Sequence, residues 1–308
     1  MIEKYHCKLE YDTDVLVLRV ADEPMRTIPL RRLEKIICLH NTEVTTQLLG
    51  QLYQRRIDFI VLNSRYDSHS VALYGDTHGL ANRRCQQYAL QLEPGLRLPL
   101  AQAICQHKFL VAQRIIKQMG AHRIQSQLEM AFESARQCVT EGQLRGVEGS
   151  VQRALFQFWR SQISPEWGFE QRVRRPPPDP VNALLSLTYT LVHQEAVRQC
   201  KRYALDPMLG FYHQLAYNRH SLACDLMEPL RPKLDAWLFQ FLNAGPLNRR
   251  HFSKAKTEGC FLGKEGRLLF YAQFEPQMPM IKRSLAASAL WCVRQLKTQP
   301  ASLLFQAQ

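Results

Sequence analysis

Residues 15–39 read VLVLRVADEPMRTIPLRRLEKIICL, and this stretch decides the fold of the N-terminal part of the chain. It contains three short apolar runs, residues 15–18, 26–30 and 36–39, which turn-forming and charged residues separate. Runs of this length and composition are typical of β-strands. Two more such runs, residues 57–62 and 71–74, follow before residue 80. The first eighty or so residues therefore predict a small β-rich domain.

One helix is predicted to interrupt these strands. Between the third and fourth runs, four apolar residues recur at helical spacing: Val44, Leu48, Leu49 and Leu52. Asn41 or Thr42 precedes them, and the side chain of either can accept a hydrogen bond from a free backbone N–H of the first helical turn. We therefore expect a helix over residues 42–56.

From about Asn82 the pattern changes to long helices, predicted over residues 98–119, 124–138, 147–163 and 282–297. The segment 164–180 contains the run Pro176-Pro177-Pro178 and cannot continue a helix, so it is predicted to be an exposed loop. A late hairpin is predicted from strands 260–262 and 268–270 around a turn at residues 263–266.

These elements define the predicted fold class and domain division. The chain has 308 residues, which is long enough for two domains. Hydrophobic residues make up 46% of it and charged residues 22%, and this composition argues against disorder. We predict an α+β fold. A small β-rich domain over residues 1–85 precedes a larger, all-helical domain over residues 86–308.

The charge of the chain favours a polyanionic partner. Lysine and arginine number 40 against 27 acidic residues, which gives a formal net charge of +13. Five arginine pairs are scattered along the chain: Arg31-Arg32, Arg55-Arg56, Arg83-Arg84, Arg174-Arg175 and Arg249-Arg250. This distribution suits a folded surface that contacts nucleic-acid phosphates at several places, although acids nearby could also neutralise some of the pairs.

The nine cysteines include no C-x-x-C pair, so neither a zinc ribbon nor a disulfide framework is indicated. They are interpreted as buried thiols of a reducing compartment. The N-terminal residues lack the apolar core of a signal peptide, and the most apolar stretch, residues 181–192, is too short to span a bilayer. The expected location is cytoplasmic, without membrane association.

Glu148 is the first residue that indicates chemistry. In the predicted helix 147–163 it lies on the same face as Leu155 and Trp159. A charge on an apolar face is costly, so such a carboxylate pairs with a cation, binds a metal ion or lies at the edge of the buried surface. Gly146 and Gly149 leave room beside it for a ligand or another backbone.

A second group of polar residues lies in two segments, residues 205–214 (LDPMLGFYHQ) and 221–232 (SLACDLMEPLRP). It contains His213, Asp225 and Glu228. The two acids are three residues apart and share a face if the segment is helical, and oxygen ligands with an added imidazole suit a hard divalent cation. Alone, each would more often be structural. Pro229 leaves open whether the segment is a straight helix, a kinked one or a helix start.

In order along the chain, these motifs resemble the CRISPR-associated integrase of spacer acquisition, the first family of CRISPR-associated proteins. The matching residues are Ile28-Pro29-Leu30, Leu33-Glu34-Lys35-Ile36, Asn82, Arg84, Gln87, Gly146 to Gly149, Asn182-Ala183-Leu184-Leu185, Tyr189, Leu205-Asp206-Pro207, Gly210-Phe211, His213 and Asp225 to Pro232. They cover nearly the whole chain. Gln214 departs from the family, in which many members carry an acid, and Arg219-His220 replaces a common glycine and basic-proline pattern.

The resemblance implies an enzyme that inserts captured DNA fragments into a CRISPR array, by attack of a 3′-hydroxyl on phosphodiesters of the repeat. Glu148, His213 and one or both of Asp225 and Glu228 match the family's metal-binding catalytic residues, with Mg²⁺ or Mn²⁺ as cofactor. It also implies a homodimer that assembles with the small second CRISPR-associated protein, with the β-rich domain providing dimerisation and companion contacts. Alanine at any of these four positions is expected to stop strand joining and to leave the fold intact, because removing one clustered carboxylate relieves repulsion.

Several alternatives stay open. The same residues would serve a metal-dependent endonuclease that acts on branched or free DNA with water as nucleophile, and the basic surface alone would suit a non-catalytic DNA-binding scaffold. His213 could ligate the metal or act as acid and base. Tyr189, Tyr212 or Tyr217 could position a DNA strand or only pack, and Arg231 could bind a phosphate or pair with Asp235 or Glu228.

Overall fold

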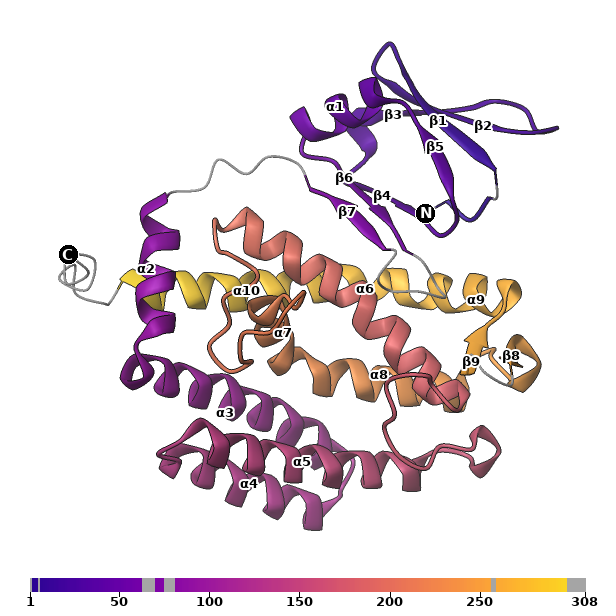
Figure 1. The fold of residues 1–308 in the computed structure, drawn as a ribbon. Coiled ribbons are helices and arrows are strands. Elements are labelled where there is room, and N and C mark those ends of the chain that lie inside the picture. Colours follow the sequence, from indigo (N-terminus) through magenta and orange to yellow (C-terminus); the bar gives the residue numbers. More distant parts are fainter. Residues whose placement is uncertain (1, 5, 63–69, 75–80, 256–258, 298–308) are drawn as a thin grey trace. The chain divides into compact units, whose positions relative to one another are not determined.

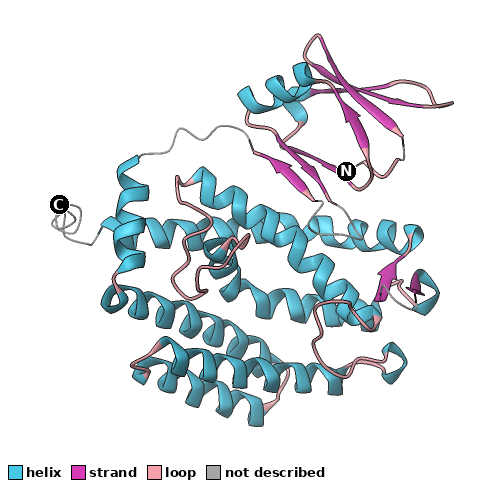
Figure 2. Cartoon of the chain, viewed as in Figure 1, coloured by secondary structure: helices cyan, strands magenta, loops and turns pink. Residues whose placement is uncertain are grey.

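The computed structural model describes residues 2–4, 6–62, 70–74, 81–255 and 259–297. The chain divides into two compact units, residues 1–78 and 79–308 (Figure 1). The first unit contains most of the strands and the second contains most of the helices (Figure 2). The predicted fold class is thereby confirmed, whereas the predicted domain limit after residue 85 falls inside helix α2 (Ala81–Leu92).

Two small sheets make up the first unit. The four-stranded sheet has the order β3-β2-β1-β5 and consists of β1 (Cys7–Asp12), β2 (Val15–Val20), β3 (Arg26–Pro29) and β5 (Thr42–Val44). The three-stranded sheet has the order β4-β6-β7 and consists of β4 (Lys35–Cys38), β6 (Asp58–Val61) and β7 (Val71–Leu73). All five predicted strands are therefore present, each within a few residues of its predicted limits.

One helix, α1 (Thr46–Gln54), closes the core of this unit. It buries Leu48 and Leu52 against Leu9 and Leu16 of the four-stranded sheet. The predicted start of the helix at residue 42 is wrong. Thr42–Val44 pairs in parallel with β1, and the helix begins after Thr45, whose hydroxyl accepts a hydrogen bond from the Leu48 N–H.

The second unit is built around nine α-helices in the described part of the chain. They are α2 (Ala81–Leu92), α3 (Pro94–Gln118), α4 (His122–Gln137), α5 (Glu141–Gln162), α6 (Pro180–Arg202), α7 (Ser221–Met227), α8 (Arg231–Ala244), α9 (Lys264–Phe274) and α10 (Met278–Lys297). All four predicted long helices are confirmed in α3, α4, α5 and α10. No helix of the described residues has the length and apolar character needed to cross a membrane.

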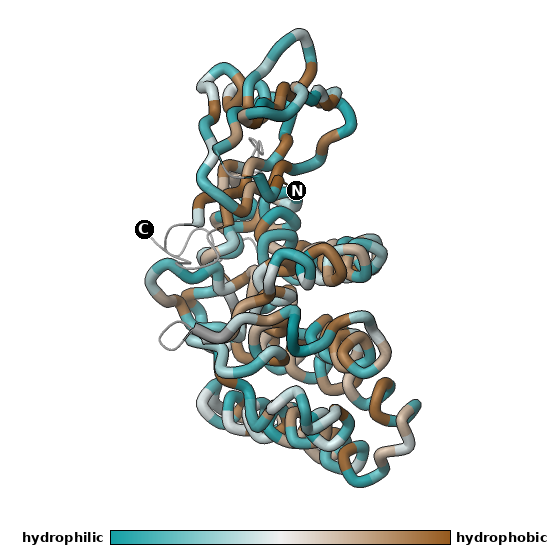
Figure 3. Tube along the Cα trace, turned by 90° about the vertical axis from the view of Figure 1, so that its right-hand side faces the viewer, coloured by the Kyte–Doolittle hydropathy of each residue, from teal (hydrophilic) through white to brown (hydrophobic). Residues whose placement is uncertain are grey.

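Helix α3 is central in this unit, because it packs against α4, α8 and the short 3-10 helix η4 (Glu228–Leu230). It accordingly buries residues on several sides, among them Ile104, Phe109 and Ile116. Helix α5 meets α8 through the ring of Trp159, which stacks on Phe239 with centroids 5.0 Å apart. Figure 3 shows apolar and polar residues alternating along the helices, as expected for elements with one face in a core.

The predicted late hairpin is wrong in its second half. Strand β9 (Gly259–Leu262) does form a hairpin, but its partner is the preceding strand β8 (Phe252–Ala255). The expected second strand, residues 268–270, lies inside α9. Phe270 and Phe274 are four residues apart and both contact the ring of Trp237, so helical spacing brings two aromatic rings to one core position. The described residues of the helical unit thus include one short hairpin, β8–β9.

Candidate active site

A cleft with a volume of about 860 Å³ opens in the helical unit. Three of the four predicted site residues, Glu148, His213 and Glu228, line it, together with eight basic side chains: Lys108, Arg145, Arg153, Arg160, Arg172, Arg174, Arg219 and Arg231. The acids therefore lie within a strongly basic surface. Such a cleft suits a substrate that carries many negative charges.

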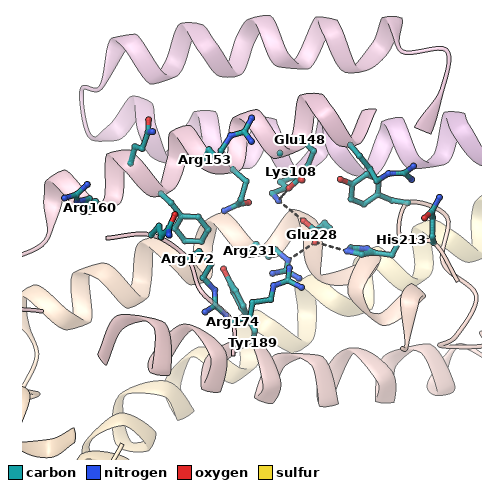
Figure 4. A pocket seen from close by; sticks show the side chains of 18 of the residues that line it. Lys108, Glu148, Arg153, Arg160, Arg172, Arg174, Tyr189, His213, Glu228 and Arg231 are labelled. Atoms are coloured by element: carbon teal, nitrogen blue, oxygen red, sulfur yellow. Dashed lines mark hydrogen bonds and ion pairs between the residues drawn. The ribbon is translucent and has the colours of Figure 1, made fainter. Parts of the chain in front are cut away.

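Glu148 and Glu228 come from different helices and meet at the buried ammonium of Lys108 (Figure 4). The Lys108 Nζ atom lies 2.5 Å from Glu148 Oε1 and 2.8 Å from Glu228 Oε2. The side chain of Lys108 is 2% exposed, against 17% for Glu148. Burial lowers the pKa of Lys108, but the charges of Glu228 and Glu148 outweigh it and hold that pKa above its usual value.

Lys108 is a site residue that was missed in the sequence, although a signal was present. It lies in the predicted helix 98–119, in line with the apolar residues Ile104, Cys105 and Ala112, all of which are buried. A charge in such a stripe is the same signal that singled out Glu148. A lysine differs from Glu148 in that an ammonium group cannot ligate a metal ion, so its position alone does not indicate a metal site.

Glu228 is placed by a break between two helices. Helix α7 ends at Met227, η4 covers Glu228–Leu230 and α8 starts at Arg231, so the segment is kinked at Pro229. The Arg231 Nε atom lies 2.8 Å from Glu228 Oε1, although its N–H is not directed along this line and forms no hydrogen bond within the described residues. Burial raises the pKa of Glu228, but the cations Arg231 and Lys108 lower it more, to well below its usual range.

Asp225 is fully buried, and it holds the backbone of the loop that carries His213. Its Oδ2 accepts hydrogen bonds from the N–H groups of Phe211 (2.6 Å) and Tyr212 (3.0 Å). Its Oδ1 accepts one from the N–H of His213 (2.9 Å) and lies 2.7 Å from His213 Nδ1. A carboxylate has about four acceptor positions, and all four are used here.

The same contact sets the orientation of the His213 ring. Since a carboxylate accepts, Nδ1 donates to Asp225, and this bond fixes the ring with Nε2 on its other side. Nε2 lies 3.7 Å from Glu228 Oε1. The imidazole therefore turns Nε2 toward Glu228, where the neutral ring would be able to ligate a cation or accept a proton.

Two further residues, Gln87 and Gly210, fix the position of this loop. The buried side chain of Gln87, on α2, donates hydrogen bonds to the carbonyls of Asp206 and Leu209 and accepts one from the Asp206 N–H. Gly210 packs so tightly that a Cβ atom there would lie 2.8 Å from Ser221 and 2.9 Å from Asp225 Oδ2. The resemblance had included both residues without giving them a role.

We expect Gly210→Ala to lower the free energy of unfolding by about 1–3 kcal/mol, the usual cost of overpacking. The added methyl group would push Ser221 away from the loop or displace the Asp225 carboxylate. Urea denaturation followed by circular dichroism measures the loss. Gly146→Ala is the matched control. An added Cβ there meets nothing within 4 Å outside its own helix backbone and chain neighbours, and alanine favours helix more than glycine does. The stability of this variant should therefore equal or exceed that of the wild type. Equal stability of the two variants would contradict the packing argument.

A second layer of aromatic and basic residues lies behind Glu228. The guanidinium of Arg231 lies over the ring of Tyr189, with its carbon 4.6 Å from the ring centroid. The Tyr189 hydroxyl donates to Asp235, and burial raises the pKa of Asp235 to about 6. Arg172 donates to the side chains of Asn182 and Ser186 on α6.

The open alternatives for the tyrosines and for Arg231 can now be compared with their positions. Tyr189 packs beneath Arg231 and also lines the cleft, as does Tyr212. Burial and the nearby charge of Glu148 raise the pKa of Tyr212. Tyr217 is fully exposed and does not line the cleft. Of the two acids considered for Arg231, Glu228 is the one that forms the ion pair.

The four predicted residues thus lie together, but in two roles. Asp225 and Glu228 each contact His213, and Lys108 joins Glu148 to Glu228. In the described part of the chain, no three Asp, Glu, His or Cys side chains form a ready-made metal cluster. The reason is visible in the geometry. Lys108 lies between two of the acids, and Asp225 turns both oxygens toward the loop.

Comparisons with known proteins agree with this fold. The chain is 33% identical over 285 residues to the CRISPR-associated endonuclease Cas1 1 of Thermodesulfovibrio yellowstonii, and 89% of each chain is covered. A solved casposase bound to integration product matches with a TM-score of 0.82 at 15% identity, covering 100% of this chain and 93% of that one. A Cas6-RT-Cas1--Cas2 complex matches with a TM-score of 0.82 at 20% identity, covering 98% of this chain and 35% of that one.

The family model described as CRISPR associated protein Cas1 matches residues 1–276. Together with the relative from Thermodesulfovibrio, this match confirms the predicted resemblance. The chain belongs to the Cas1 family of CRISPR-associated proteins.

Proposed function

We propose that this chain is a metal-dependent DNA integrase that inserts captured DNA fragments into a CRISPR array. The observation that carries the proposal is the meeting of Glu148, Glu228 and the Nε2 atom of His213 in a cleft that seven arginines also line. The likeness to a casposase solved with its integration product supports strand joining, and the endonuclease name of the Thermodesulfovibrio relative supports action on phosphodiesters.

Glu148, Glu228 and His213 would hold the metal ion. Two carboxylates and one imidazole suit Mg²⁺ or Mn²⁺, and the Lys108 ammonium between the carboxylates indicates that this position favours positive charge. When bound, the ion would polarise the attacked phosphate and lower the pKa of the attacking hydroxyl. Asp225 is assigned to orienting His213, because its acceptor positions are already filled.

In the proposed reaction, the 3′-oxygen of the captured fragment bonds to a phosphorus of the repeat and displaces the 3′-oxygen of the cut strand. One phosphodiester forms while one breaks, and the proton of the attacking hydroxyl passes to the strand that leaves or to solvent. In the neutral ring, Nε2 of His213 would ligate the ion or accept this proton. Arg231 and Arg172 border the cleft beside these residues, where a guanidinium would neutralise phosphate charge.

The proposed partners are the captured DNA fragment and the CRISPR repeat, a second copy of this chain, and the small second CRISPR-associated protein. A net charge of +13 supports DNA binding. The solved complex that contains both Cas1 and Cas2 supports the companion protein. The homodimer, with dimerisation and companion contacts in the β-rich unit, rests on the family resemblance.

Strand joining is the test that separates this proposal from the endonuclease alternative. A labelled fragment with a free 3′-hydroxyl is mixed with a plasmid that carries leader and repeat, in Mg²⁺ or Mn²⁺, with the companion protein present. We expect covalently joined products, which EDTA abolishes. Nicked plasmid without joined label would favour the endonuclease, and DNA binding without any reaction in either metal would favour a scaffold.

We expect DNA affinity to fall steeply with salt. Each neutralised phosphate contributes about −0.9 to the slope of log affinity against log salt on duplex DNA, so several arginine contacts give a slope of several units. The double variant Arg153→Gln/Arg174→Gln, whose side chains line the cleft, should reduce the slope by about 2. Fluorescence anisotropy from low to moderate salt measures it.

The matched control is Arg123→Gln/Arg136→Gln on α4, which removes two exposed arginines that do not line the cleft. Its slope should equal that of the wild type. If both double variants change the slope equally, the DNA does not bind in the cleft.

A further inference from the structure

We propose that Lys108 is a fixed internal counter-charge that makes metal and DNA bind the active site together. When DNA is absent, its charge weakens binding of the metal ion. When DNA is present, the same charge favours the state in which metal and DNA are both bound. The inference rests on the proposed function, because it takes Glu148, Glu228 and His213 as the metal site.

Lys108 occupies a fixed, buried position between the two acids. Its side chain is 2% exposed and projects from α3, the central helix of the unit, so the ammonium is held in place by its surroundings. It pairs with Glu148 through Oε1 and with Glu228 through Oε2. The other oxygen of Glu228, Oε1, faces His213 Nε2 and Arg231. Lys108 therefore leaves an oxygen of Glu228 available on the side of the imidazole.

The net charge of the site determines which combination of ligands it favours. Asp225, Glu148 and Glu228 supply three negative charges, while Lys108 and Arg231 supply two positive ones, so the site carries one net negative charge when His213 is neutral. A divalent cation would make the site net positive, and one phosphodiester would then make it neutral. A metal ion alone therefore leaves an uncompensated positive charge in a buried site, which is costly.

Without Lys108, the site would favour binding of the metal ion alone over binding of metal together with phosphate. The site would carry two net negative charges, and a divalent cation alone would neutralise it. A phosphodiester would then add an unmatched negative charge. The presence of Lys108 thus shifts the favoured state from metal alone to metal with phosphate. By linkage, the factor by which DNA raises metal affinity equals the factor by which metal raises DNA affinity.

The test is a Mn²⁺ titration of the full chain, with free Mn²⁺ measured by electron paramagnetic resonance. It is done without DNA and with a fragment whose 3′-ends are dideoxy, so that no reaction occurs. For the wild type we expect DNA to tighten Mn²⁺ binding about tenfold, the effect of a single charge a few ångströms away after screening. Lys108→Met should bind Mn²⁺ about tenfold more tightly without DNA and should lose most of this coupling.

Two further variants complete the design. Lys108→Gln removes the charge but keeps hydrogen-bond donors for both acids, so it covers the case in which Lys108→Met does not fold. Lys117→Met is the matched control, because it removes an exposed lysine from the same helix and should behave as the wild type. Circular dichroism confirms folding before each titration.

The outcomes are distinguishable. If the wild type binds no Mn²⁺ at the site, with or without DNA, the proposed function and this inference are both overturned. If it binds Mn²⁺ but DNA does not tighten that binding, the counter-charge role is overturned whatever the variants do. The role also fails if a folded Lys108 variant binds Mn²⁺ no more tightly than the wild type, whereas the proposed metal site stands.

Discussion

Strand joining by the Glu148→Gln variant is expected to fall about a thousandfold, the equivalent of several kcal/mol of stabilisation at the attacked phosphate. Glutamine keeps the shape of the side chain and an oxygen that can accept from Lys108, but it removes the negative charge that would hold a divalent cation. His213→Ala should lose as much, because ligands of one metal ion act as a unit and their effects do not add.

The fold should stay intact in both variants, and DNA affinity measured in EDTA should stay close to wild type, because no metal ion then couples to DNA binding. The Glu148 side chain is 17% exposed and that of His213 is 20% exposed, so neither substitution opens a deep cavity. The measurement compares joining rates in Mg²⁺ and Mn²⁺ with melting temperature and fragment affinity. Glu170→Gln is the matched control, since this acid lines the same cleft but is exposed and pairs with Arg160. Wild-type joining by either variant, or unfolding, would show that the assigned site is wrong.

Asp225→Ala is expected to lower the free energy of unfolding by about 3–5 kcal/mol and to abolish joining. The contacts of Asp225 revise the expectation from sequence that all four substitutions leave the fold intact. Three backbone N–H groups and the His213 ring donate to this buried carboxylate, and alanine would leave these donors without a partner. Urea denaturation measures the loss.

Two comparisons make this prediction specific. Asp225→Asn keeps the shape and one acceptor oxygen, so it should lose less stability than alanine, but its amide would face backbone N–H donors. Asp12→Ala, at an exposed strand end, is the control and should change stability by less than about 0.5 kcal/mol. A variant Asp225→Ala with wild-type stability would contradict the structural role and return Asp225 to the candidate ligands.

Much of the fold was predictable because local patterns agree with it. The five predicted strands and the long helices follow from apolar periodicity alone. Strand β1 was missed because CKLEYD alternates with charged residues, and only its pairing with β2 makes it a strand. The strand predicted at residues 268–270 failed because a short apolar run does not distinguish a buried strand from one face of a helix.

The residue types of the candidate site were predictable from the sequence, but the separate role of each residue was not. Asp225 and Glu228 are equivalent as a pattern, yet one accepts from the loop backbone and the other faces the cleft. This difference depends on the path of residues 206–213, which Gln87 fixes from a helix far away in the sequence. Contacts over such separations leave no local signal.

These contacts join residues that are far apart in the sequence, which affects the order in which the site forms during translation. Lys108 meets Glu228 across 120 residues, and Gln87 holds Leu209 across 122. Loops of this size close late, since their entropy must be lost before any contact compensates. A chain still on the ribosome carries Glu148 and the cleft arginines of α5 long before it carries Glu228. The growing polypeptide therefore carries the basic residues of α5 before it carries the last acid of the site, Glu228.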